Sequence, residues 1–183
     1  MSPKSSGPAQ ELEWELCSQR RGLSGHVQAV TRTYRMPDGT IQDWDILESG
    51  PTVAVLALTE NSQVVMVRQF RPGPGVTLLE MPGGMVEPEE SILAAAAREL
   101  LEETGYHGQL ESAGSCWLSA RDTRRSHVAV AREATLVAAP SLDEGEFCET
   151  VLISLDRFRE LLREGDLTDV DLGYLALDHL GRL

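Results

Sequence analysis

The sequence predicts an α/β protein in which helices pack on a mixed β-sheet. Two kinds of run support this: short apolar stretches bounded by turn residues, which are typical of strands, and longer stretches with helical spacing. The clearest helix is residues 89–104, because four consecutive alanines inside it favour helix formation strongly. Helical spacing recurs at 155–163 and 170–180.

The N-terminal part predicts an antiparallel hairpin followed by two further strands. Residues 27–35 and 42–47 are β-leaning runs, and the turn signal Pro-Asp-Gly at 37–39 lies between them. Residues 52–58 and 63–69 are the next two strands, because polar turn residues separate them.

The region around the central helix predicts a loop and three extended runs. Residues 71–76, RPGPGV, are expected to form a loop, because proline and glycine disfavour both helix and strand. A short run at 78–81 leads towards the helix. Residues 108–118 and 127–137 alternate like strands, which completes a mixed sheet covered by helices.

The composition indicates one folded domain and excludes some partners. A chain of 183 residues with 42% hydrophobic content can bury one substantial core. The formal net charge of −13 argues against a nucleic-acid partner, which would need a basic stripe on the protein. Residues 1–10, rich in serine, proline and glycine, are expected to be a disordered lead.

The sequence carries no sign of membrane insertion or secretion. No apolar run approaches the length of a membrane span, and the first residues lack the apolar core of a signal peptide. We therefore expect a cytoplasmic protein with no membrane partner. Cys17, Cys116 and Cys148 are far apart and form no CxxC pair, so neither a disulfide framework nor a zinc site is indicated.

Three glutamates in the central helix predict a divalent-metal site. Glu99, Glu102 and Glu103 are spaced i, i+3 and i+4, so their carboxylates project from one helix face. Hard oxygen ligands this close suit Mg²⁺, which leaves coordination positions open for water and substrate phosphate oxygens. The alternative is that these glutamates only solvate the outer face of the helix, since exposed like charges cost little.

Other residues around the helix favour the metal site. Glu90 and Arg98 are eight residues apart and are expected on nearly the same side of one helix, where Arg98 could orient the carboxylates. Gly105 is expected to end the helix in the left-handed conformation. Gly83 and Gly84 are expected to open it, with backbone free to approach a ligand.

The string from 84 to 106 resembles the Nudix box, GX5EX7REUXEEXGU, in which U is aliphatic. The matching positions are Gly84, Glu90, Arg98, Glu99, Leu100, Glu102, Glu103 and Gly105, while Tyr106 is aromatic where the family usually has an aliphatic residue. The resemblance implies a Nudix α/β/α sandwich with a mixed β-sheet and an N-terminal antiparallel β-hairpin extension. It implies residues 51–183 as the hydrolase domain and residues 11–50 as the extension, which would help to build a homodimer.

Segments before the box resemble one branch of the family. RQFR at 68–71 and EMPGG at 80–84 look like the ADP-ribose and nucleoside-diphosphate-sugar pyrophosphatases. The resemblance implies Mg²⁺-dependent hydrolysis, with Mn²⁺ as a substitute, of a diphosphate bond into a nucleoside monophosphate and a sugar phosphate. The usual ADP-ribose pattern has a proline after the box, and none occurs between Pro88 and Pro140. This departure argues against ADP-ribose itself and leaves another sugar nucleotide or nucleotide diphosphate open.

The resemblance also assigns roles to residues. It implies a metal sphere completed by the Gly83 carbonyl, a supporting Glu90–Arg98 pair and a general base in the acidic loop at 143–146, for which we choose Glu144 over Glu146. The implied metal ligands are Gly83, Glu99, Glu102 and Glu103; the catalytic residues are Glu102, Glu103 and Glu144; the substrate-binding candidates are Arg68, Glu80, Arg124, Arg125 and Trp14.

Simpler explanations exist for the residues outside the box. Arg68 and Glu80 could form a strand-edge ion pair, and the arginines at 121–125 could pair with surface acids. The acidic loop could be an ordinary surface turn, and Trp14 could pack in a core or an interface. Two other functions also stay open: a Nudix enzyme acting on a nucleoside triphosphate, dinucleoside polyphosphate or coenzyme A, and a non-catalytic nucleotide sensor.

Overall fold

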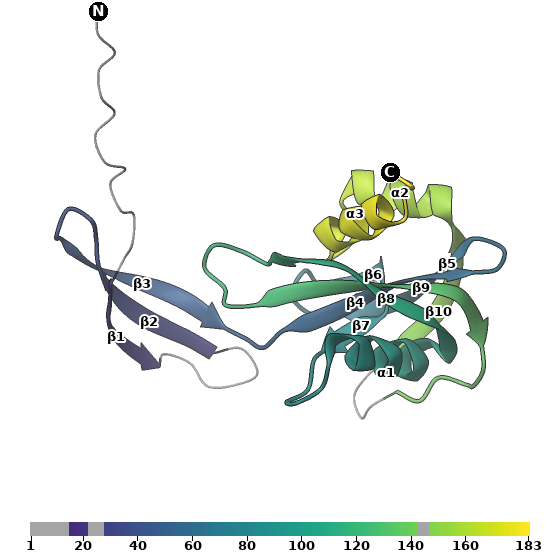
Figure 1. Cartoon of the computed structure of the whole chain (residues 1–183), viewed down its shortest axis with the longest axis horizontal. Helices are drawn as coiled ribbons and strands as arrows, with labels where there is room; N and C mark the ends of the chain where they lie inside the picture. The colour runs from purple at the N-terminus through teal and green to yellow at the C-terminus, as the bar shows by residue number, and fades with distance from the viewer. Residues whose placement is uncertain (1–14, 22–27, 143–146) are drawn as a thin grey trace, which may run out of the picture. The chain divides into compact units, whose positions relative to one another are not determined.

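The computed structural model describes residues 15–21, 28–142 and 147–183 (Figure 1). The chain forms two compact units. The N-terminal unit comprises the residues up to Ser49 together with 119–123, and the main unit comprises 50–118 and 124–183. The expected lead at 1–10 lies outside the described residues.

The N-terminal unit is a three-stranded antiparallel sheet in the order β1-β2-β3. Its strands are β1 (Glu15–Arg21), β2 (Gln28–Arg35) and β3 (Ile41–Glu48). The predicted hairpin is β2–β3, and its turn is held by Asp38, whose carboxylate accepts from the Thr40 backbone N–H at 2.9 Å. Strand β1 was not predicted; it pairs with β2 from Glu15 to Arg21, with a shift of register between Leu16 and Ser18.

The main unit is a seven-stranded mixed sheet between helices. The central order is β10-β5-β4-β9-β8, with β6 paired to β5 and β7 to β4; only the β4–β9 pair is parallel among the strand pairs that the structure describes. The strands are β4 (Thr52–Thr59), β5 (Gln63–Arg71), β6 (Val76–Glu80), β7 (Gly83–Met85), β8 (Tyr106–Trp117), β9 (Arg125–Leu136) and β10 (Cys148–Ser154).

Helices cover both faces of this sheet, as Figure 1 shows for α1 on one side and α2 and α3 on the other. They are α1 (Ile92–Thr104), α2 (Leu155–Glu164) and α3 (Val170–His179). Alternate residues of β4 point to opposite faces. Val53 and Val55 pack with α1, whereas Ala54 and Leu56 pack in the core that contains α2 and α3. The predicted α/β/α sandwich is confirmed.

The start of the central helix differs from the expected position. The helix begins at Ile92, because the Ser91 side chain caps it by accepting from the Ala94 N–H at 3.2 Å. Glu89 has a positive φ of 67°, which is incompatible with the expected helix start. Gly83 and Gly84 do not open the helix; they lie in strand β7, paired with β4.

The RPGPGV segment is a tight hairpin rather than a loop throughout. Arg71 ends β5 and pairs with Val76, the first residue of β6, so only 72–75 form the turn. The two prolines are confined to the turn, so they interrupt neither strand. This hairpin brings Arg71 close to Glu80 at the end of β6.

Candidate active site

The last turn of α1 is held against strand β7. The Gly83 N–H donates to Glu103 Oε2 at 2.8 Å. Glu103 is only 6% exposed. An added Cβ at Gly84 would lie 2.3 Å from Glu99 Oε1. Glycine at 84 therefore lets the backbone of β7 lie directly against the Glu99 carboxylate, and glycine at 83 lets it lie against the backbone of β4.

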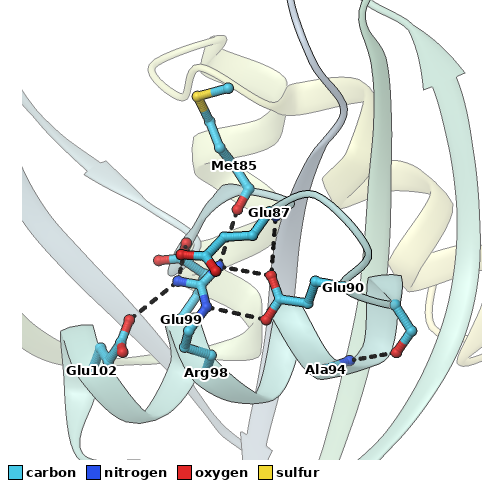
Figure 2. Close-up of polar contacts among 8 residues, drawn as sticks. Met85, Glu87, Glu90, Ala94, Arg98, Glu99 and Glu102 are labelled. Carbon is cyan, nitrogen blue, oxygen red and sulfur yellow. Dashed lines mark hydrogen bonds and ion pairs between the residues drawn. The ribbon is translucent and has the colours of Figure 1, made fainter.

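Arg98 joins the carboxylates of this region (Figure 2). Its Nε donates to Glu90 Oε1 at 3.1 Å, and its Nη2 donates to Glu90 Oε2 at 3.1 Å and to the Met85 carbonyl at 3.0 Å. Its Nη1 donates to Glu99 Oε1 at 2.8 Å and to Glu102 Oε2 at 3.2 Å. A guanidinium has five N–H donors, so every one is used. These bonds, above all those to Glu90, raise the pKa of Arg98.

Glu90 contacts Arg98 from outside the helix. It precedes the cap residue Ser91, so the expectation that Glu90 and Arg98 share one helix is wrong, although the expected contact between them is present. The Glu90 carboxylate also accepts from the Glu87 N–H at 3.1 Å. The hydrogen bonds from Arg98, followed by that from Glu87, lower the pKa of Glu90.

A cavity of about 560 Å³ lies beside β7 and α1 in the main unit. Its wall combines acidic residues, arginines, neutral polar residues and apolar residues. The charged and polar residues in the wall are Thr52, Gln69, Arg71, Glu87, Arg98, Glu99, Glu103, Arg124, Thr168 and Asp169. A concave site on which several polar and charged groups converge is typical of a small-molecule site.

The acidic part of this wall fits a divalent cation by its chemistry. Glu99 and Glu103 offer carboxylate oxygens beside backbone that only glycine permits, and hard oxygen donors suit Mg²⁺. Over residues 15–21, 28–142 and 147–183, no three His, Cys, Asp or Glu side chains are arranged to hold a metal ion. Arg98 pairs with both Glu99 and Glu102 beside this part of the wall.

A second group of polar residues in the wall was not predicted from the sequence. Glu80 is 1% exposed and accepts from Arg71 Nε at 2.6 Å, and its other oxygen accepts from the Thr168 hydroxyl. Arg71, Thr168 and Asp169 line the cavity. Glu80, predicted to bind substrate, therefore holds two residues of the cavity wall in place. Burial and the nearby Glu80 charge raise the pKa of Asp169.

The predicted substrate arginines have different positions. Arg124 lines the cavity. Arg125 lies outside its lining; its guanidinium stacks 5.0 Å from the Trp117 ring centre and donates to the Ser115 hydroxyl at 3.0 Å. Arg68 also lies outside the lining and pairs with Glu149 at 2.9 Å on the exposed surface.

Strand geometry explains why Arg71, rather than Arg68, reaches the cavity. The two arginines of RQFR are three residues apart in β5, so their side chains leave opposite faces of the strand. This alternation is readable from the sequence once residues 63–71 are recognised as one strand. The remaining predicted site residues, Trp14 and Glu144, lie outside the described residues, so their roles stay predictions.

Comparison with known proteins identifies the family. The family model for the NUDIX domain matches residues 48–171. The chain belongs to the Nudix family. This Nudix protein is a hydrolase that acts on pyrophosphate bonds, and it is related to ADP-ribose pyrophosphatases at modest identity. In the described part of the chain, no helix has the length and apolar content needed to cross a membrane.

Relatives of this Nudix hydrolase match it over different shares of its length. It is 29% identical over 173 residues to an ADP-ribose pyrophosphatase of Bacillus subtilis, covering 92% of this chain and 93% of the relative. It is 32% identical over 142 residues to a methanol dehydrogenase activator of Bacillus methanolicus, covering 73% and 74%. A mouse ADP-sugar pyrophosphatase is 37% identical over 95 residues, covering 46% and 44%.

A solved structure shows the same fold. The crystal structure of an ADP compounds hydrolase superposes with a TM-score of 0.81 at 18% identity, covering 96% of this chain and all of that chain. The identity is low, so this likeness concerns the fold alone.

Proposed function

We propose that this Nudix hydrolase cleaves the diphosphate bond of a nucleoside diphosphate sugar such as ADP-ribose, in a Mg²⁺-dependent reaction. The products would be a nucleoside monophosphate and a sugar phosphate. The observation that supports this best is one cavity that contains both the box carboxylates Glu99 and Glu103 and the guanidinium group of Arg124. A diphosphate needs positive charge near both its phosphates, and guanidinium groups suit phosphate oxygens.

The metal ligands in this proposal are Glu99, Glu102, Glu103 and the carbonyl of Gly83. A bound divalent cation would neutralise the diphosphate and lower the pKa of coordinated water, which makes a nucleophile available near neutral pH. Arg98 keeps Glu99 and Glu102 oriented through its Nη1 donors. Residues that fix the ligands of a metal commonly change its affinity when they are mutated.

The protein groups would then move a proton and hold the substrate. The oxygen of water bonds to one phosphorus, the P–O bond of the anhydride breaks, and Glu144 accepts the proton released by the water. Arg124 would bind a phosphate from the cavity wall. We further propose a homodimer built by the N-terminal extension, an aromatic contact of Trp14 with the nucleobase, and a cytoplasmic location.

The test is a substrate panel with wild type and Glu103→Gln. Release of phosphate-containing products is measured with Mg²⁺ or Mn²⁺ from ADP-ribose, UDP-glucose, GDP-mannose, a nucleoside triphosphate, a dinucleoside polyphosphate and coenzyme A. We expect metal-dependent cleavage of a diphosphate sugar, reduced at least about 100-fold in Glu103→Gln, because one ligand carboxylate becomes neutral.

Glu60→Gln is the matched control, because Glu60 is exposed in the turn between β4 and β5 and lies outside the cavity lining. It should retain wild-type activity. Cleavage of another substrate class alone would overturn the substrate assignment and leave the pyrophosphatase chemistry intact. Nucleotide binding without cleavage of any substrate would favour the sensor function instead.

A further inference from the structure

Asp169 is the residue directly before α3, but its side chain does not cap the helix. An aspartate in the cap position usually accepts a hydrogen bond from an N–H of the first helical turn. Asp169 is the residue before α3, yet its side chain makes no such bond, and the residue lines the cavity. Its carboxylate is therefore placed in the wall of the cavity rather than used to stabilise the helix end.

The neighbouring hydroxyl cannot satisfy this carboxylate. Thr168 Oγ1 donates to Glu80 Oε1 and also lies 3.3 Å from Asp169 Oδ2. A hydroxyl has one hydrogen to donate, so the bond to Glu80 leaves none for Asp169. Among the described residues, Asp169 has no other side-chain hydrogen bond. Within the described protein, an ionised Asp169 thus has only this long contact to a hydroxyl that is already bonded elsewhere. Burial, followed by the nearby Glu80 charge, raises the pKa of Asp169.

The groups around Asp169 fit a sugar better than a phosphate. The amide of Gln69 and the hydroxyl of Thr168 line the same cavity and can both donate to and accept from sugar hydroxyls. Arg71 carries one positive charge, but Glu80 neutralises it, so this part of the wall has a net negative charge with Asp169. A carboxylate accepts hydrogen bonds from sugar hydroxyls, as in dinucleotide sites, whereas it repels a terminal phosphate.

We propose that Asp169 is a specificity-determining residue: its carboxylate accepts hydrogen bonds from hydroxyls of the sugar that is released with a phosphate, and it disfavours substrates with a terminal phosphate at this position. This inference rests on the proposed function, because it names the part of the protein that would prefer a diphosphate sugar over a nucleoside triphosphate. Sugar hydroxyls would provide the donors that the protein lacks at Asp169.

The test compares wild type with Asp169→Asn, which has nearly the same shape and no charge. For ADP-ribose, kcat/KM should fall about 10- to 100-fold, the usual effect of losing a hydrogen bond to a charged group. For ATP, kcat/KM should stay constant or rise, because the repulsion is removed. Asp171→Asn is the matched control, because it removes a charge from the start of the same helix. Asp171 accepts a hydrogen bond from the Cys116 thiol and lies outside the cavity lining.

A substrate analogue keeps the test independent of folding of the variant. With wild type, replacing ADP-ribose by an analogue without hydroxyls on the distal ring should lower kcat/KM. The decrease should be by the same factor as the one that Asp169→Asn causes with ADP-ribose. Combining both changes should cause little further loss. An equal loss on ADP-ribose and ATP, or fully additive losses with the analogue, would overturn the role of Asp169.

The wild-type data separate the two proposals. Cleavage of nucleoside triphosphates in preference to diphosphate sugars by wild type would refute the proposed function, and it would refute the role of Asp169 with it. Cleavage of diphosphate sugars by wild type with unchanged substrate preference in Asp169→Asn would refute only the role of Asp169.

Discussion

Adding a single methyl group at Gly83 or at Gly84 tests the close approach of β7 to its neighbours. At Gly83 the added Cβ would lie 2.2 Å from the Val53 carbonyl oxygen and 2.8 Å from the Ala54 Cα. Both atoms belong to the backbone of β4, so relief requires the two paired strands to separate. At Gly84 the nearest atom, at 2.3 Å, is Glu99 Oε1, the end of a flexible side chain.

These different neighbours predict different consequences. Gly83→Ala should destabilise the protein by about 3 kcal/mol, the upper part of the usual range for overpacking, because backbone cannot turn aside as a side chain can. For a chain of this length that corresponds to a fall in Tm of about 6 to 12 °C. Gly84→Ala should cost about 1 kcal/mol, since rotation of Glu99 relieves the clash.

The displaced Glu99 should then affect metal binding. Gly84→Ala is expected to weaken Mn²⁺ binding about 10-fold or more, because the methyl group occupies the position of a ligand carboxylate. Thermal unfolding in the presence of a chelator measures the stability effect, and calorimetric titration with Mn²⁺ measures the binding effect. Gly73→Ala is the control, because an added Cβ there has no neighbour within 4 Å.

Two results would refute this reasoning. If Gly83→Ala melts within about 2 °C of wild type, β7 does not approach β4 as closely as the structure shows. If Gly84→Ala binds Mn²⁺ with wild-type affinity, the Glu99 carboxylate is not a ligand, and the proposed metal site must be assigned to other residues.

Two further predictions concern Arg98 and its partners. Arg98→Lys should lower the free energy of unfolding, measured by urea denaturation, by about 1 to 2 kcal/mol. Three N–H donors on one nitrogen cannot replace five in a planar fork, although partial exposure to solvent weakens each bond. An unchanged free energy of unfolding would contradict this. The pKa of Glu90 is lower in the folded protein than its ordinary value of 4.5, so its ionised form stabilises the protein at pH values above 4.5. This stabilisation is lost as the pH falls through the pKa of Glu90 in the folded protein. Glu90→Gln should therefore flatten the fall in urea midpoint below about pH 4.5, and a profile parallel to wild type would argue against the ion pair.

The sequence predicted the central helix and its acidic face well, because both depend on local spacing. The i, i+3 and i+4 glutamates and the left-handed cap at Gly105 follow from helix geometry alone. The start of the helix was predicted wrongly, because the alanine run gave no information about the cap. Ser91 provides that information, since serine is a preferred cap residue, and Glu90 therefore lies before the helix.

The polar wall around Asp169 could not have been predicted from spacing. Thr168 and Glu80 are 88 residues apart in sequence, and they meet only because the hairpin β5–β6 and the start of α3 lie next to each other in the folded main unit. Neither residue belongs to the Nudix box. Strand alternation in RQFR could have favoured Arg71 over Arg68, but the identity of its partner Glu80 depends on the hairpin register.

The charge balance of the cavity explains why metal dependence is a physical expectation as well as a family trait. Its lining contains four acidic residues, Glu87, Glu99, Glu103 and Asp169, and three arginines, Arg71, Arg98 and Arg124. Arg98 and Arg71 are already bonded to glutamates, so neither offers its full charge to a substrate. A diphosphate would therefore enter a wall that is close to neutral or negative. Divalent cations on the acidic part of the wall would reverse that charge where the phosphates bind, and the half near Asp169 would stay suited to a sugar.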